Sequence, residues 1–288
     1  MSHIRQCDRY KELECLWRQL TDRLSNWRPD WRVLAGPPKL GTASAGTFRH
    51  GTLSNQVIFE AFAVALLSGN TRWDRIERIR DDLAQAFAGF DLLRYSLIPD
   101  REIDQILVPW FREHRAGSPA LRTGLCRLRA TAHRLSSYPG GKTSAHAFLL
   151  DAGSASDGSP EDLAVVLARS PEWKLPGFGI ALAAEALRIL GLDLCKPDRH
   201  ILRALGSWSL IEFAHWNERG AFTPPRANPS ELRRTMFEVR AIAEANDVSV
   251  SYANSVIWMA GAVSGAHLTN AEFREIGTVC IPRASIVG

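Results

Sequence analysis

Residues 175–205 read LPGFGIALAAEALRILGLDLCKPDRHILRAL, and this stretch carries the most informative pattern in the chain. It opens with the turn-forming pentapeptide Leu175-Pro176-Gly177-Phe178-Gly179. An almost wholly apolar run over 180–190 follows, long enough for about three helical turns. The chain then turns at Gly191. The pattern predicts two short helices joined by a tight hairpin, with the second helix buried.

The hairpin has the composition of a phosphate-binding turn. Gly177 and Gly179 have no side chains that would block the approach of a phosphate. Backbone amides at a helix N-terminus attract anions, because they lack acceptors and lie at the positive end of the helix dipole. Such a turn holds the DNA backbone without reading the bases. The pentapeptide by itself fits an ordinary corner between two helices equally well.

Asp198 lies 21 residues after Gly177. This spacing favours a functional site over an ordinary corner between two helices. Pro197 and Asp198 suit the entry of a further helix, in which Arg199 and Arg203 share one face. Capping that helix is the purely structural role of Asp198. A catalytic role is compatible with capping, because backbone donors hold a capping carboxylate rigidly and keep it ionised.

Composition indicates a folded protein with a sizeable core. The chain has 288 residues, 45% of them hydrophobic, and a net charge of +4, which is compatible with a polyanionic partner. The five cysteines are scattered and form no CxxC pair, so we expect reduced thiols and neither a disulfide framework nor a zinc or iron–sulfur site. The N-terminus has no apolar signal core, and no apolar run is long enough for a bilayer. We therefore expect a soluble cytoplasmic protein, associated with the nucleoid if bacterial.

Apolar residues recur at helical spacing along most of the chain. About ten helices are predicted, at residues 7–26, 55–68, 73–87, 101–116, from 118, from 160, 180–190, from 198, 228–245 and 251–261. Ser54 is the predicted N-cap of the second helix, and Pro109 should disturb the fourth. Residues 151–159 are rich in Gly, Ser and Asp and predict a flexible connection, and 278–281 are a candidate short strand.

The hairpin, the apolar helix and the Asp-x-His-Ile-x-Arg sequence together resemble the signature of the helix-hairpin-helix DNA glycosylases. The residues that carry the resemblance are Leu175, Pro176, Gly177, Gly179, Asp198, His200, Ile201 and Arg203. The similarity extends to 62–71 and 252–261. The resemblance implies an all-α fold of two lobes with a cleft between them. One lobe is 53–195, ending in the helix-hairpin-helix at about 161–190, and the other combines 1–52 with 196–288.

The resemblance also implies a role for each matching residue. Asp198 stabilises the cationic sugar formed as the glycosidic bond breaks and orients a water molecule, after the target base has been flipped out of the duplex. Members that cleave the strand have a lysine where this chain has Ala181, so the resemblance implies a glycosylase without lyase activity. The implied DNA contacts are Leu175, Pro176, Gly177, Phe178, Gly179, Asn70, Arg72, Lys174, Arg199 and Arg203.

Asn70 has an alternative role as a helix C-cap. No cofactor is implied, and the only metal is a monovalent cation held by the hairpin carbonyl oxygens. The expected partner is double-stranded DNA that contains a damaged or modified base, bound by a monomer without membrane association.

Three alternatives for the function stay open from the sequence. The excised base is an alkylated or deaminated base in base excision repair, or a hypermodified phage base removed in antiviral defence. The third alternative is a hairpin module that binds DNA without catalysis.

Overall fold

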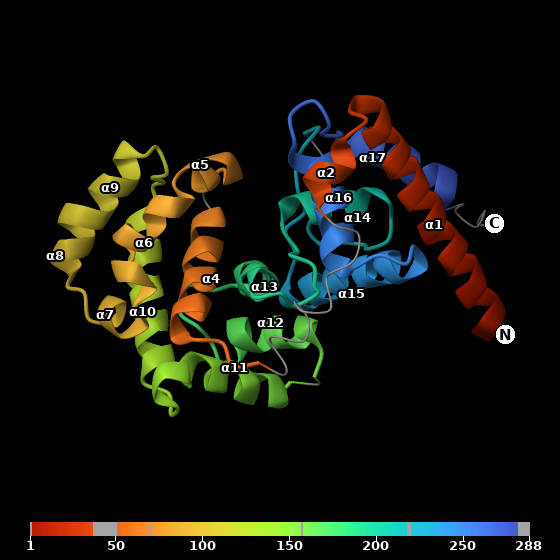
Figure 1. The fold of residues 1–288 in the computed structure, drawn as a ribbon. Coiled ribbons are helices and arrows are strands. Elements are labelled where there is room, and N and C mark those ends of the chain that lie inside the picture. The colour runs from red at the N-terminus through yellow and green to blue at the C-terminus, as the bar shows by residue number, and fades with distance from the viewer. Residues whose placement is uncertain (1, 37–50, 70, 157, 218–219, 282–288) are drawn as a thin grey trace. The chain divides into compact units, whose positions relative to one another are not determined.

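The computed structural model describes residues 2–36, 51–69, 71–156, 158–217 and 220–281, and every regular element in these residues is helical (Figure 1). The chain divides into two compact units. Met1–Gly41 and Asp193–Gly288 form the first, called here the terminal unit, and Thr42–Leu192 form the central unit. Asp198 therefore belongs to the terminal unit, whereas the hairpin belongs to the central unit. Among the described helices, none combines the length and apolar character that crossing a membrane requires.

The central unit contains ten α-helices in its described residues. They are α4 (Asn55–Ser68), α5 (Trp73–Arg78), α6 (Leu83–Ala86), α7 (Leu92–Ser96), α8 (Asp100–Glu102), α9 (Val108–Glu113), α10 (Leu121–Ser136), α11 (Ser144–Ser154), α12 (Pro160–Arg169) and α13 (Ile180–Ile189). Short 3-10 turns lie at Arg80–Asp82, Ala88–Phe90 and Gly141–Thr143.

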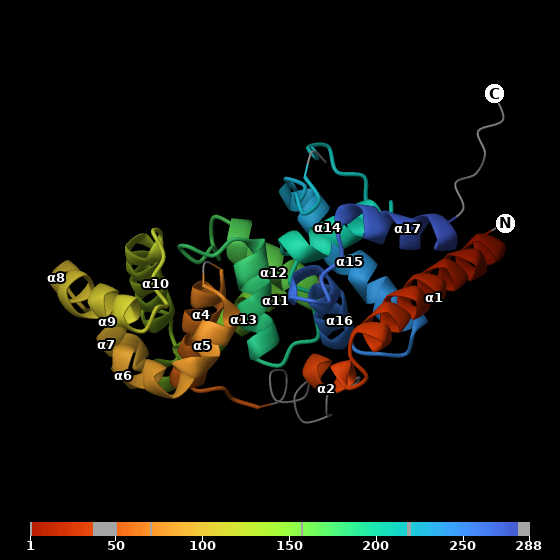
Figure 2. The same ribbon diagram turned by 90° about the horizontal axis from the view of Figure 1, so that it is seen from above.

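Helix α4 is the centre of this unit. Every residue from 61 to 67 is buried, and α10, α11 and α13 pack around the helix (Figures 1 and 2). Ser54 caps α4 by accepting a hydrogen bond from the Val57 amide, as the sequence predicts. On one side the ring of Phe59 contacts the rings of Phe87, Phe90 and Tyr95. A helix that is apolar almost all round is stable only when it is covered in this way.

The predicted helix over 101–116 is disturbed before Pro109. Ile103–Leu107 form a π-helical turn between α8 and α9. Proline has no N–H to donate, and its ring clashes with the carbonyl four residues earlier, here Gln105. The wider π turn accommodates both effects. The single helix predicted over 73–87 is likewise divided, into α5, a 3-10 turn and α6.

The terminal unit contains α1 (Ser2–Trp27), α2 (Trp31–Ala35), α14 (Arg199–Ser207), α15 (Pro229–Ala245), α16 (Val250–Ala262) and α17 (Asn270–Cys280). Helix α16 is almost entirely buried and contacts α14 and α15, while α1 lies along α15 and α17 (Figure 2). Gly261 allows α14 to approach α16 closely, because a Cβ atom at Gly261 would lie 2.9 Å from the Cβ of His200. This close approach determines the surroundings of Asp198.

Two predictions for irregular or extended segments are wrong. Residues 151–154 belong to the last turn of α11, because Phe148, Leu149 and Ala152 bury one face of that helix. Residues 278–280 belong to α17 and form no strand. A capping box between Thr269 and Glu272 starts α17.

The prediction that all cysteines are reduced is also wrong. Cys15 on α1 and Cys280 on α17 form a disulfide, with their Cα atoms 5.4 Å apart. The two residues are 265 positions apart in the sequence, and only the packing of α1 against α17 brings them together. Cys7, Cys126 and Cys195 are thiols that take no part in a disulfide.

Replacement of Phe59 by alanine should lower the free energy of unfolding by about 3–5 kcal/mol, because it leaves a cavity among the three aromatic rings. Val57→Ala on the same helix is the matched control, since Val57 is 46% exposed. Urea unfolding followed by far-ultraviolet circular dichroism measures both variants. Equal stability losses in the two variants would contradict the central position of α4.

Candidate active site

Asp198 is the N-cap of α14. Its Oδ1 atom accepts hydrogen bonds from the His200 amide at 2.9 Å and the Ile201 amide at 3.3 Å. The Oδ2 atom accepts no hydrogen bond from any described residue, and the side chain is half-buried. The predicted cap is thus confirmed. Oδ1 caps the start of α14, and Oδ2 is available to bind a ligand or a water molecule.

The segment that leads to Asp198 is held by a buried amide side chain. Asn254, on the apolar helix α16, accepts hydrogen bonds at its Oδ1 from the Lys196 amide (3.0 Å) and the Cys195 thiol (3.2 Å). Asp193 adds a second attachment, because its carboxylate accepts from the Val250 and Ser251 amides at the start of α16. Sequence reasoning missed both residues. The only local signal was a polar asparagine within an apolar helix.

His200 lies beside Asp198 on the first turn of α14. Its Nδ1 is 2.7 Å from the Gly261 carbonyl oxygen, which only accepts, so Nδ1 carries the proton. Its Nε2 lies 3.1 Å from Arg199 Nε, which only donates, so Nε2 is the acceptor. These contacts define a neutral imidazole. Burial lowers the pKa of His200 below its ordinary value of 6.5, against the opposing effect of the Asp198 charge.

Arg203 is not on the surface, contrary to its predicted DNA contact. It is 2% exposed and donates to the Asn270 Oδ1 (2.8 Å), the Leu268 carbonyl (2.6 Å) and the Gly261 carbonyl (3.2 Å). Within the described chain it forms no ion pair. Burial lowers the pKa of its guanidinium from the ordinary value. The Arg203 side chain faces the core of the terminal unit. Its hydrogen bonds connect α14 to the loop between α16 and α17.

The hairpin of the central unit is anchored by apolar side chains. Leu175 and Phe178 are buried, and the Phe178 ring packs edge-on against Phe62 of α4 with centroids 5.0 Å apart. Thr131 of α10 donates to the Pro176 carbonyl at 2.8 Å. The predicted DNA contacts of Leu175 and Phe178 therefore cannot come from their side chains, and only their backbone is available.

The hairpin leaves several backbone groups without partners. Gly177 has φ of +87°, a conformation that L-residues rarely adopt. Among the described residues, the amides of Gly177, Gly179 and Ile180 find no acceptor, and Gly179 is exposed. These donors precede the ten-residue helix α13 and lie at its positive end. Their arrangement suits an anion.

The carbonyl groups of the hairpin are the oxygens that the predicted monovalent cation would use, and two of them already accept hydrogen bonds. Thr131 occupies the Pro176 oxygen, and the Leu175 oxygen accepts from the Phe178 amide at 3.2 Å. The Phe178 oxygen accepts no hydrogen bond within the described chain. Carbonyl oxygens of this kind fit a cation that prefers oxygen ligands. No cluster of three or more His, Cys, Asp or Glu side chains suited to a metal occurs among the described residues.

The remaining residues predicted to contact DNA are polar and lie in both units. Lys174 and Arg199 are exposed, and Arg199 is engaged with His200. Arg72 is exposed and forms a bidentate ion pair with Asp74 (3.0 and 3.2 Å). Such a surface pair is weak enough to exchange its partner for a phosphate. Asn70 lies outside the described residues.

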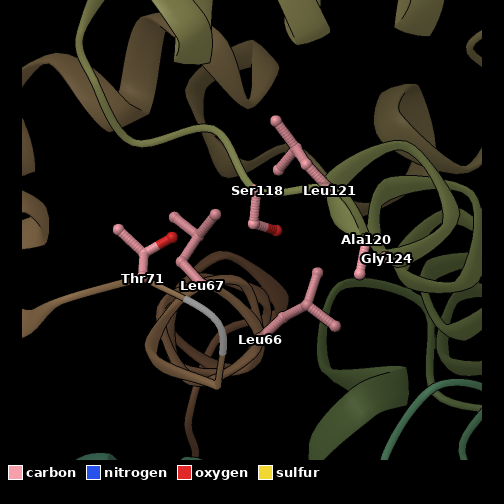
Figure 3. Close-up of a pocket in the computed structure, with 7 residues that line it drawn as sticks. All are labelled: Leu66, Leu67, Thr71, Ser118, Ala120, Leu121 and Gly124. Atoms are coloured by element: carbon pink, nitrogen blue, oxygen red, sulfur yellow. The ribbon is translucent and has the colours of Figure 1, made fainter.

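A small pocket lies between the end of α4 and the start of α10 (Figure 3). Its lining is mostly apolar, with the hydroxyl groups of Thr71 and Ser118 at the rim. The volume is about 30 Å³, the space of one water molecule. The pocket is therefore too small for a nucleobase.

Comparison of the chain with family models, with curated proteins and with solved structures gave no match.

Gly177→Ala should lower the free energy of unfolding by about 2–4 kcal/mol, because φ is positive there and the new Cβ would lie 2.7 Å from the Cβ of Arg127. Gly179→Ala is the matched control, since its backbone is extended and no atom lies within 4 Å of the place that a new Cβ would take. Chemical unfolding of both variants provides the test. An unchanged free energy of unfolding in Gly177→Ala would contradict this hairpin conformation.

His200 should titrate below pH 6.5 in the folded protein. In the unfolded chain it binds a proton near pH 6.5, so the unfolded state holds more protons just below that pH. The contribution of His200 to stability is therefore complete above pH 6.5 and declines as the pH falls towards its folded pKa. NMR of the imidazole ring protons, assigned by their loss in His200→Asn, measures the midpoint. A midpoint above 6.5 would rule out the neutral, buried ring.

Proposed function

We propose that the protein is a monofunctional DNA N-glycosylase of the helix-hairpin-helix type, which flips a damaged or modified base out of duplex DNA and leaves an abasic site. One observation carries the proposal. The Asp198 carboxylate is fixed by two backbone amides through Oδ1, while Oδ2 accepts nothing from the described residues. The resemblance in the sequence assigns this same residue the catalytic role.

The geometry of Asp198 suits stabilisation of a cationic sugar. As the bond between C1′ and the base breaks, the base leaves with the bonding electrons and positive charge develops on the sugar. A fixed carboxylate beside that charge stabilises the transition state without reorganising. The free Oδ2 atom also suits the orientation of the water molecule that adds to C1′ and then loses a proton.

The hairpin supports the proposal as a DNA-backbone contact. The amides of Gly177, Gly179 and Ile180, which have no acceptor in the described residues, supply donors for a phosphate, and exposed Lys174 adds positive charge. Contacts of this kind position a duplex and carry no sequence information. The contact would therefore be independent of the base to be removed.

The absence of an amine in α13 favours water as the nucleophile. Ala181, in the first turn of α13, occupies the position at which strand-cleaving glycosylases carry a lysine. Without that amine no Schiff base forms with the opened sugar, and the strand stays intact after base release. The product would be an abasic site that other enzymes process.

Asp198→Asn should reduce base release at least about a hundredfold while leaving DNA affinity within about twofold. Asparagine is also a good N-cap, so α14 keeps its start and only the negative charge is lost. Asp22→Asn, at an exposed position on α1, is the matched control. The assay incubates protein with alkylated, deaminated and phage-modified duplexes and cleaves abasic sites with alkali.

The substrate that yields abasic sites distinguishes repair from antiviral defence. Undiminished release by Asp198→Asn would disprove the catalytic assignment. DNA binding without abasic sites in any of the three DNA classes would instead identify a non-enzymatic hairpin module.

A further inference from the structure

A second cationic site lies in the central unit, at an open pocket of about 420 Å³. The lining residues are Arg75 of α5, Arg112 of α9, Arg115, and the turn Gly117-Ser118-Pro119 before α10. We call this set the arginine pocket. None of these residues belongs to the hairpin or to the surroundings of Asp198.

The charges of the arginine pocket are not balanced by ion pairs with the described residues. Arg112 and Arg115 form no ion pair with a described residue, and Arg75 donates only to a neutral group, the Arg115 carbonyl, at 3.0 Å. Two neighbouring arginines of the same unit are paired with carboxylates: Arg122 with Asp104 at 2.6 Å and Arg129 with Asp100 at 2.6 Å. Three like charges around one pocket repel one another unless an anion enters.

The turn before α10 adds donors to the same pocket. Hydrogen bonds from Arg75 and Thr71 occupy the carbonyls of Arg115 and Ala116. The amides of Gly117 and Ser118 donate to no described acceptor, and neither does the Ser118 hydroxyl, which also lines the small pocket of Figure 3. The turn therefore has amide and hydroxyl hydrogen atoms available for a ligand, and the two carbonyl oxygens that precede it are occupied.

The helix that follows increases the positive potential. Helix α10 has 16 residues, yet its N-cap residue Ala120 makes no side-chain capping bond and its first turn contains no acidic residue. The one charged residue in the first turn, Arg122, is positive and is paired with Asp104. The unbalanced arginines and the free amides thus point to the same kind of ligand.

We propose that the arginine pocket binds a phosphoryl anion, supplied either by a nucleic-acid backbone or by a small phosphorylated molecule. Guanidinium groups bind phosphate oxygens in a bidentate manner, and several of them around one group give a specific site. The volume accommodates a diphosphate or a phosphodiester with its sugars. The inference does not depend on base release by Asp198, which lies in the other unit.

The test uses the full chain and the double variant Arg112→Gln/Arg115→Gln. The matched control is Arg80→Gln/Arg94→Gln, which removes the same charge at two exposed positions of the central unit. Calorimetric titration with pyrophosphate examines the small-molecule source. Fluorescence anisotropy of a labelled duplex at several salt concentrations examines the nucleic-acid source, in the wild type and in the Asp198→Asn background. Thermal unfolding verifies that each variant is folded.

We expect the pocket variant to weaken phosphoryl binding at least about tenfold relative to the control. Weaker duplex binding, with the slope of log affinity against log salt reduced by about one, identifies a backbone phosphate. Weaker pyrophosphate binding with unchanged duplex binding identifies a small phosphorylated ligand. Pocket and control variants that behave alike in both titrations overturn the proposal, whatever the activity of Asp198.

Discussion

The surroundings of Asp198 depend on one buried cation, the guanidinium of Arg203. It donates to three neutral oxygens inside the terminal unit and has no carboxylate partner among the described residues. A buried charge is tolerated only when strong hydrogen bonds replace its water. Because the Gly261 carbonyl accepts from both Arg203 and His200, one atom fixes the side of α14 that follows Asp198. The orientation of the carboxylate therefore depends on residues more than sixty positions later in the chain.

The hairpin and the surroundings of Asp198 are stabilised by different kinds of contact. In the hairpin, buried Leu175 and Phe178 hold the turn by apolar packing, and the amides of Gly177, Gly179 and Ile180 find no acceptor among the described residues. At Asp198, polar contacts hold the backbone, and one side-chain oxygen has no donor within the described part of the chain. The first arrangement suits an anion and the second suits a cation. The proposed base release would use both, the hairpin for a DNA phosphate and Asp198 for the cationic sugar.

Local features were predicted well where neighbouring residues decide the structure. The start of α4 at Ser54 and the cap at Asp198 follow from side chains within three residues. Predictions failed where contacts between segments that are distant in the sequence determine the structure. Helical packing extended α11 and α17 into segments whose composition favours turns or strands. Asn254 and Asp193 were missed because their partners lie more than fifty residues away.

The sequence by itself determined an all-helical chain, the hairpin with its two glycines, and the cap at Asp198, because each depends on short-range periodicity or on backbone conformation. Only the tertiary structure decided which charged side chains are available. It buried Arg203 and left Arg112 and Arg115 around a pocket without an ion pair to any described residue. It also joined Cys15 to Cys280. The exposure and pairing of a long polar side chain depend on which helices pack beside it, and that information is spread over the whole chain.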